Sequence, residues 1–121
     1  MIGRVDLQGR ALLTIPVSNA SDGRPITVVE VWSDTGFTGD LVLPLNQIKE
    51  LGLRPSSVVQ TTTADGRESS KDRFVAWIDW FGSLEKVEVI ASSGQNVLLG
   101  VRLMLGHRLI VDYRTLRVEL E

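Results

Sequence analysis

A chain of 121 residues with 43% hydrophobic residues has the length and composition of one ordinary folded domain. Its net charge of −2 provides no basic surface of the kind that nucleic acids require. There is no cysteine, which excludes disulfides, thiolate metal ligands and a cysteine nucleophile. A catalytic zinc site usually needs several His or Cys ligands, and the chain has one histidine, His107. We interpret His107 as a surface or strand-edge residue.

The sequence also lacks the signs of a membrane protein or a secreted one. No apolar run approaches the roughly 20 residues that a membrane-spanning helix needs. The first ten residues carry charges and glycines and lack the apolar stretch of a signal peptide. We therefore expect residues 1–121 to form one cytoplasmic domain, with no metal or organic cofactor and with neither a membrane nor a nucleic acid as partner.

The first third of the chain predicts a β-hairpin. Residues 11–17 alternate apolar and polar side chains, and Pro16 indicates an edge position or a bulge in this strand. A turn rich in Ser, Asn, Asp and Gly follows at residues 18–25. Residues 26–33 are dense in β-branched side chains and predict the second strand.

A loop, an apolar segment and a short helix come next. The loop at residues 34–39 contains two glycines, and the apolar segment at 41–43 ends at Pro44. The helix is predicted because its apolar residues share one face by i, i+3 spacing, and Gly52 occupies the position at which helices commonly end. The three apolar residues are Leu45, Ile48 and Leu51.

The remaining sequence predicts further short strands. Strands at residues 58–63 and 74–80 flank Asp65-Gly66, a strong signal for a hairpin turn. The later predicted elements are a strand at 84–92, a buried run at 97–99, a helical turn at 101–105, and strands at 109–113 and 116–120. Many short strands with glycine turns and one or two short helices predict an all-β domain, either a closed barrel or a sandwich.

The tripeptide Asp34-Thr35-Gly36 is the strongest candidate for chemistry. It follows the β-branched strand directly and opens the glycine loop, so the backbone holds the carboxylate on both sides. Thr35 supplies a hydroxyl that both donates and accepts, and Gly36 permits a close backbone approach or a positive φ. The same tripeptide also suits an ordinary surface turn, so by itself it leaves both interpretations open.

The wider sequence Val-Trp-Ser-Asp-Thr-Gly-Phe-Thr-Gly-Asp-Leu-Val-Leu-Pro, residues 31–44, closely resembles the catalytic segment of retropepsin-like aspartic peptidases. It is most similar to a small prokaryotic branch whose loop reads D-T-G-F-x-G. Leu98, Leu99 and Gly100 resemble the two hydrophobic residues and the glycine that pack beneath that loop. The family's flap tip corresponds to Thr63, Ala64, Asp65 and Gly66. The three segments have the right order and spacing, and the resemblance covers residues 13–113.

The resemblance implies a retropepsin-like monomer and an aspartic endopeptidase acting on a peptide or protein. In such enzymes two facing carboxylates share a proton and hold a water, and one acts as base while the other donates to the scissile carbonyl. The sequence contains one Asp-Thr-Gly, so a homodimer is needed to supply a second Asp34. Strands at the chain ends clamp the family's dimer, and the alternation of Leu116, Val118 and Leu120 with charged residues suits an interface strand.

Two other interpretations stay open at this stage. The chain could be a catalytically silent dimerisation or peptide-binding module with the same fold, or an unrelated β-barrel binding protein with a chance motif. Individual residues also have two interpretations. Trp77 and Trp80 either line a substrate groove or pack in the core. Ser33 stands where an apolar residue is expected before Asp34, and Phe37 fits the prokaryotic branch and could narrow the floor of the cleft.

Overall fold

The computed structural model describes residues 1–56, 59–62 and 68–121. The strands are β1 Ile2–Val5, β2 Ala11–Ser18, β3 Thr27–Ser33, β4 Leu41–Pro44, β5 Arg54–Pro55, β6 Val59–Thr62, β7 Glu68–Lys71, β8 Arg73–Trp80, β9 Ser83–Ser92, β10 Leu98–Leu99, β11 Leu109–Asp112 and β12 Arg117–Leu120. The helices are α1 Leu45–Leu51 and α2 Val101–Met104. Short strands dominate, so the all-β class predicted from the sequence is confirmed.

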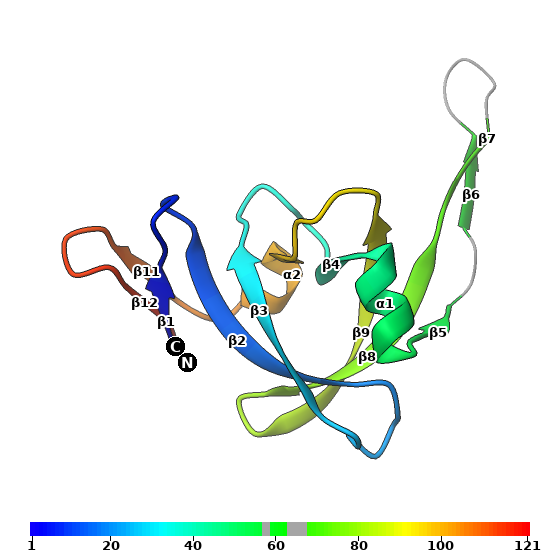
Figure 1. Ribbon diagram of the computed structural model, residues 1–121, viewed down its shortest axis with the longest axis horizontal. Coiled ribbons are helices and arrows are strands. Elements are labelled where there is room, and N and C mark those ends of the chain that lie inside the picture. Colours follow the sequence, from blue (N-terminus) through cyan, green and yellow to red (C-terminus); the bar gives the residue numbers. More distant parts are fainter. Residues whose placement is uncertain (57–58, 63–67) are drawn as a thin grey trace.

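Most strands belong to one strongly curved sheet (Figure 1). Its order is β11-β12-β1-β2-β3-β10-β4-β9-β8-β5, and β8 also pairs with β2. The extra pairing brings the sheet back on itself, so the ladders through β2, β3, β10, β4, β9 and β8 form a closed circuit. The separate hairpin of β6 and β7 extends away from this sheet at the right of Figure 1.

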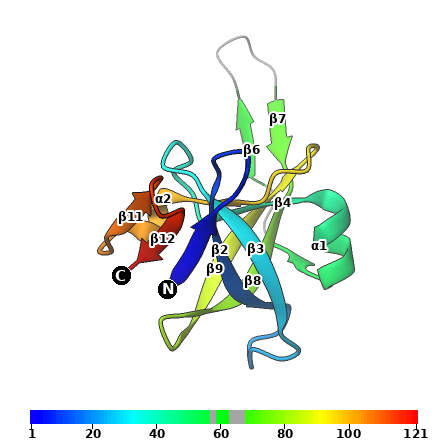
Figure 2. The same ribbon diagram turned by 60° about the vertical axis from the view of Figure 1, so that its left-hand side comes forward.

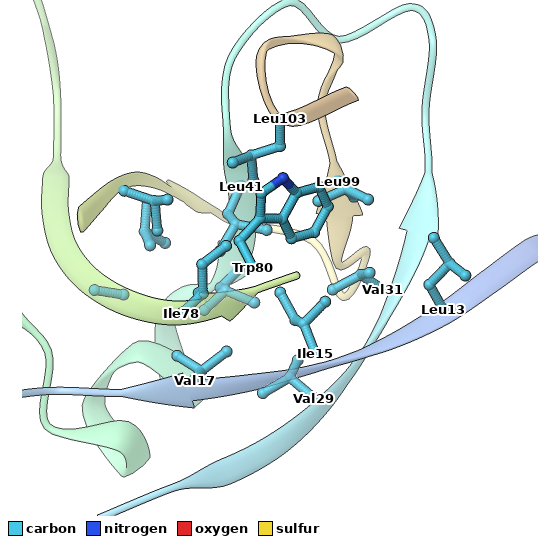
Figure 3. Packing of buried hydrophobic residues seen from close by; sticks show 14 of the residues in the cluster. Leu13, Ile15, Val17, Val29, Val31, Leu41, Ile78, Trp80, Leu99 and Leu103 are labelled. Atoms are coloured by element: carbon cyan, nitrogen blue, oxygen red, sulfur yellow. The ribbon is translucent and has the colours of Figure 1, made fainter. Parts of the chain in front are cut away.

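The core fills the inside of the curved sheet (Figure 3). The alternation predicted for the first strand is correct, because Leu13, Ile15 and Val17 of β2 are at most 1% exposed. Val31 of β3 is fully buried, as expected for a β-branched strand facing the core. Trp80 lies among the buried side chains, which favours the packing interpretation of this residue.

Pro16 does not lie on an edge strand. β2 pairs with β3 from Leu12 to Val17, with Pro16 opposite Val28. On its other side, β2 pairs with β1 at Ala11 and Leu12 and with β8 at Val17 and Ser18. Pro16 therefore lies where β2 changes from one partner to the other, and its missing N–H costs little there.

The hairpin predicted around Asp65-Gly66 has a different second strand from the one expected. The strand that returns from it is β7, not the segment from residue 74, and Thr62 pairs with Glu68. β8 instead forms a second hairpin with β9. Its two-residue turn has positive φ at both Phe81 and Gly82, as type I′ turns require.

The predicted interface strand near residue 120 is buried in the monomer. β12 lies between β11 and β1, and both of its edges are paired. Val118 and Leu120 are fully buried in the core. Leu116 precedes the strand in a turn, with φ of 59°, and is 50% exposed. The apolar alternation thus serves the monomer's own core.

The helix α1 ends as the sequence predicts. Gly52 adopts the left-handed conformation with φ of 69°, and the N–H of Leu53 donates to the carbonyl of Ile48 at 3.2 Å. Ile48 is buried, whereas Leu45 is 37% exposed. In the part of the chain that the structure describes, no helix has the length and apolar character needed to cross a membrane.

The core makes a direct prediction about stability. Ile15→Ala should lower the free energy of unfolding by about 2–5 kcal/mol, because it leaves a cavity at a fully buried position. Ile26→Ala removes the same atoms from a residue that is 62% exposed and should change it by less than about 0.5 kcal/mol. Urea unfolding of both variants measures the difference, and equal values would contradict the assignment of the core.

Candidate active site

The loop at residues 34–40 holds Asp34 at the end of β3 by backbone hydrogen bonds. The N–H of Asp34 donates to the carbonyl of Leu99 at 2.9 Å, and the N–H of Phe37 donates to the carbonyl of Asp34 at 3.2 Å. The N–H of Gly36 donates to Oδ1 of the Asp34 side chain at 2.8 Å. Asp34 is half-buried, whereas Thr35 and Gly36 are exposed. The carboxylate is therefore fixed by the backbone and still accessible from outside the chain.

The segment around β10 supports this loop from below. β10 runs parallel to β3, with Leu99 beside Ser33, and antiparallel to β4, with Leu99 beside Leu41. It therefore joins the strand that enters the loop to the strand that leaves it. The N–H of Gly100 donates to the carbonyl of Asp40, and the N–H of Val101 donates to the carbonyl of Phe37, both at 2.8 Å.

Two glycines allow the loop and its support to approach closely. A Cβ at Gly100 would lie 1.9 Å from the carbonyl oxygen of Gly39 and 2.7 Å from the Phe37 ring. A Cβ at Gly36 would lie 3.1 Å from Oδ1 of Asp34. Gly36 has no positive φ, so of the two roles considered for it, close approach is the one the structure supports. The Phe37 ring packs against the glycine backbone beneath the loop.

A second aspartate, Asp40, anchors the end of the loop and was not predicted from the sequence. It is only 8% exposed, and its Oδ2 accepts the backbone N–H of Glu88 at 3.0 Å. Nε of Arg102, in α2, lies 3.7 Å from its Oδ1. These contacts tie the loop to both β9 and α2. In the sequence, the position of Asp40 directly before a buried strand is the signal that could have identified it.

Ser33 occupies an apolar environment next to the candidate carboxylate. It is 8% exposed and lies on the same face of β3 as Val29 and Val31. Within the described residues its hydroxyl oxygen has no hydrogen-bond partner. The expectation of an apolar residue at this position agrees with its environment, although the residue present is polar.

A small pocket of about 90 Å³ lies beside the strand that carries Asp34. Its walls include Trp32, two residues before Asp34, and Arg10, whose guanidinium carbon lies 6.0 Å from the centroid of the Trp32 ring. Arg10 is held by Asp6, at 2.7 Å between Nη2 and Oδ2. The backbone N–H and then the guanidinium of Arg10 lower the pKa of Asp6 below its ordinary value. The sequence did not predict this pocket, because the residues that line it are distant in sequence and come together only in the fold.

The other sequence candidates are distributed as follows. Leu98, Leu99 and Gly100 form the support beneath the Asp34 loop. The four predicted flap residues, 63–66, lie outside the described residues, although β6 and β7 lead to them (Figure 2). His107 stacks on Phe81 with ring centroids 4.4 Å apart. Among the described residues, no group of three His, Asp or Glu side chains is placed to hold a metal ion.

Comparisons with known proteins identify the fold. No protein-family model matches the chain, and no curated protein matches its sequence. Among solved structures, a retropepsin-like aspartic protease from Rickettsia conorii superposes with a TM-score of 0.64 and 16% identity, over 99% of this chain and 88% of the other. The EIAV protease in complex with the inhibitor HBY-793 gives a TM-score of 0.59 and 19% identity, over 87% of this chain and 96% of the other. The chain therefore shares the fold of retropepsin-like aspartic proteases.

The close contact of Gly100 with the loop predicts a sensitive position. Gly100→Ala should lower the free energy of unfolding by about 3 kcal/mol, because the new methyl group collides with the Gly39 carbonyl. Gly94→Ala is the matched control, since a Cβ there meets Ser92 Oγ at an ordinary 3.5 Å. Urea unfolding compares the two variants, and a Gly100→Ala protein as stable as the Gly94→Ala protein would contradict the close packing.

Proposed function

We propose that this chain is an aspartic endopeptidase that hydrolyses peptide bonds in peptide or protein substrates, with Asp34 as its catalytic carboxylate. The observation that carries the proposal is the loop that holds Asp34 by backbone hydrogen bonds on a retropepsin-like fold. A carboxylate that is fixed yet accessible suits general acid and base catalysis, which depends first on geometry.

The proposed enzyme is a homodimer, because each chain contributes one Asp34. Two such carboxylates facing each other would share one proton and hold a water between them, since like charges about 3 Å apart do not both ionise readily. The ionised carboxylate takes a proton from the water while the water oxygen attacks the carbonyl carbon, and the protonated carboxylate donates its proton to the carbonyl oxygen. In the tetrahedral intermediate, the carboxylate that took the proton from water passes it to the amide nitrogen. The C–N bond then breaks, the amine leaves, and one hydroxyl of the intermediate returns its proton to the other carboxylate as the carboxylic acid product forms. No metal is needed for these steps.

Neighbouring residues have proposed roles around this dyad. Thr35 is exposed beside Asp34, where the resemblance implies that it hydrogen-bonds to its counterpart in the partner subunit. Gly36 donates its N–H to the carboxylate. Phe37 packs on Gly39, which supports assignment to the prokaryotic branch with a D-T-G-F-x-G loop.

Substrate recognition is proposed to use backbone hydrogen bonding. An extended peptide would lie over the Asp34 loop and pair with the flap, in the manner of an added strand. The hairpin of β6 and β7 is antiparallel and leads to residues 63–66, whose assignment as the flap tip is part of the proposal.

The decisive prediction concerns Asp34. Asp34→Asn should reduce peptide cleavage by about 10²- to 10⁴-fold or more, because an amide does not act as base towards the water. The fold should persist, since the amide oxygen can still accept the Gly36 N–H. Asp79→Asn is the matched control, because this exposed aspartate also accepts one backbone N–H, from Gly82 at 2.9 Å.

The measurement is cleavage of a peptide library by purified protein, with circular dichroism to verify folding. Equal rates for the wild type and Asp34→Asn would contradict the catalytic assignment. If folded, dimeric wild-type protein cleaves no peptide in the library, the result favours the alternative of a catalytically silent binding or dimerisation module.

A shared site also predicts a dependence on protein concentration. Specific activity should fall on dilution through the range in which the dimer dissociates, because a monomer holds half of the dyad. Sedimentation velocity at the same concentrations gives the fraction of dimer. Constant specific activity in a demonstrated monomer would refute the shared site while leaving the fold unaffected.

A further inference from the structure

The pocket beside Trp32 is lined by residues on the face of β3 that leads to Asp34. In the second half of β3 every other residue is buried, which places Glu30 and Trp32 together on the outer side of the strand. Asp34 is the next residue in this outer series. Two residues of a strand span about 7 Å, so a side chain of a peptide bound at Asp34 can reach the pocket.

Three segments of the chain meet at this pocket. Glu30 and Trp32 come from β3, and Arg10 comes from the turn directly before β2. Residues 95–97 complete the wall, and they are held there because the N–H of Trp32 donates to the carbonyl of Val97 at 2.9 Å. The volume of about 90 Å³ is small beside the roughly 300–1,000 Å³ of sites that bind a whole small molecule, and it suits one side chain.

Arg10 contributes a fixed positive group to the pocket. Its Nε donates to Oδ2 of Asp6 at 2.7 Å, and its backbone N–H donates to Oδ1 at 2.9 Å. Its Nη2 lies 2.7 Å from the same Oδ2. Among the residues that the structure describes, no hydrogen bond uses Nη1 of Arg10. This nitrogen can therefore donate to a ligand without disturbing the contact with Asp6.

Glu30 contributes a negative group to the same pocket. Nη2 of Arg4 donates to both of its carboxylate oxygens, at 3.2 and 3.3 Å, and the Glu30 side chain remains 45% exposed. A carboxylate offers about four lone-pair positions, so Glu30 can accept further hydrogen bonds. The side chains of Gln95 and Asn96 add amide donors and acceptors to the lining.

A pocket that contains both a guanidinium and a carboxylate selects against charged and apolar side chains. A ligand carboxylate is attracted by Arg10 and repelled by Glu30, and a ligand ammonium experiences the reverse. An apolar side chain displaces water from both groups and returns no hydrogen bond. A carboxamide satisfies both, because its oxygen accepts from Arg10 and its NH₂ group donates to Glu30.

We propose that this pocket is a specificity subsite that recognises glutamine or asparagine within about two residues of the cleaved bond. Arg10 and Glu30 are its specificity-determining residues. The inference rests on the proposed peptidase function and names a class of substrate for it. In the proposed homodimer each chain contributes one such pocket, so the preference holds on both sides of the cleaved bond.

Cleavage of a position-scanning library tests the preference. The library contains short peptides in which one position at a time is fixed as Gln, Glu, Met or Lys and the other positions are mixtures. Mass spectrometry of the products should find Gln near the cleaved bond about tenfold more often than Glu, Met or Lys. Enrichment of Met, Glu or Lys over Gln at these positions would overturn the proposal.

Glu30→Gln tests the assignment of the pocket with the best-cleaved Gln peptide and its Glu analogue. The change removes the charge that repels a ligand carboxylate, so the ratio of kcat/KM for the Gln peptide to that for the Glu peptide should fall about tenfold. Glu85→Gln is the matched control, because Glu85 is an exposed glutamate that also accepts a side-chain hydrogen bond, from Ser83, and does not line the pocket. An unchanged ratio in folded Glu30→Gln protein would overturn the proposal.

Arg10→Met tests the other side of the pocket. Methionine keeps an unbranched chain beside Trp32 and removes the guanidinium donors. The preference for the Gln peptide over its Met analogue should fall about tenfold, because the amide oxygen loses its charged donor. Circular dichroism verifies the fold, and a preference that persists in folded Arg10→Met protein would contradict the role of Arg10.

Binding measurements separate this proposal from the test of catalysis. Fluorescence anisotropy of labelled library pools, with Gln or Glu fixed at the central position, reports binding to folded Asp34→Asn protein without turnover. If the wild type cleaves nothing while Asp34→Asn protein binds the Gln pool more tightly than the Glu pool, the pocket is supported and the peptidase proposal is contradicted. Cleavage that depends on Asp34 but shows no preference for Gln or Asn overturns the pocket and leaves the peptidase proposal standing.

Discussion

The close contact between the Asp34 loop and the segment after β10 is the constraint on which the rest of the structure depends. Gly100 lies so near the carbonyl of Gly39 that no side chain fits between them. Because the two backbones are this close, Gly100 donates to Asp40 and Val101 donates to Phe37. The strand entering the loop and the strand leaving it are thereby fixed on opposite sides of β10. The position of the candidate carboxylate follows from this arrangement.

The curved sheet provides the rigidity that this contact needs. The pairing of β8 with β2 closes the circuit of strands around a core of buried aliphatic side chains. Asp40 connects the loop to two further elements. Its buried carboxylate accepts a hydrogen bond from Glu88 of β9 and lies near Arg102 of α2. A fixed carboxylate therefore rests on backbone contacts and packing from several strands, rather than on the tripeptide alone.

The same fold leaves one chain chemically incomplete for the proposed reaction, because one Asp34 provides half of a carboxylate dyad. In the proposed homodimer a second copy of the chain completes the dyad.

Local sequence patterns were sufficient for much of the fold. Alternation in residues 11–17 identified the buried side chains of β2, and Gly52 marked the end of α1, because strand faces and helix ends depend on neighbouring residues. The sequence also singled out Asp34 and the support at residues 98–100, through motifs of fixed spacing.

Only the tertiary structure decided which strands pair and what each pairing leaves free. Pro16 was expected at an edge or a bulge and lies where β2 changes partners, because pairing depends on strands distant in sequence. The alternation at Val118 and Leu120 was correct, but it serves the monomer's core, since a pattern specifies that a face is buried and not what covers it. The role of Asp40 likewise depends on a distant residue, because its carboxylate accepts a hydrogen bond from the N–H of Glu88, 48 residues away. The sequence by itself determined many of the local elements and the candidate carboxylate, whereas long-range packing decided their partners.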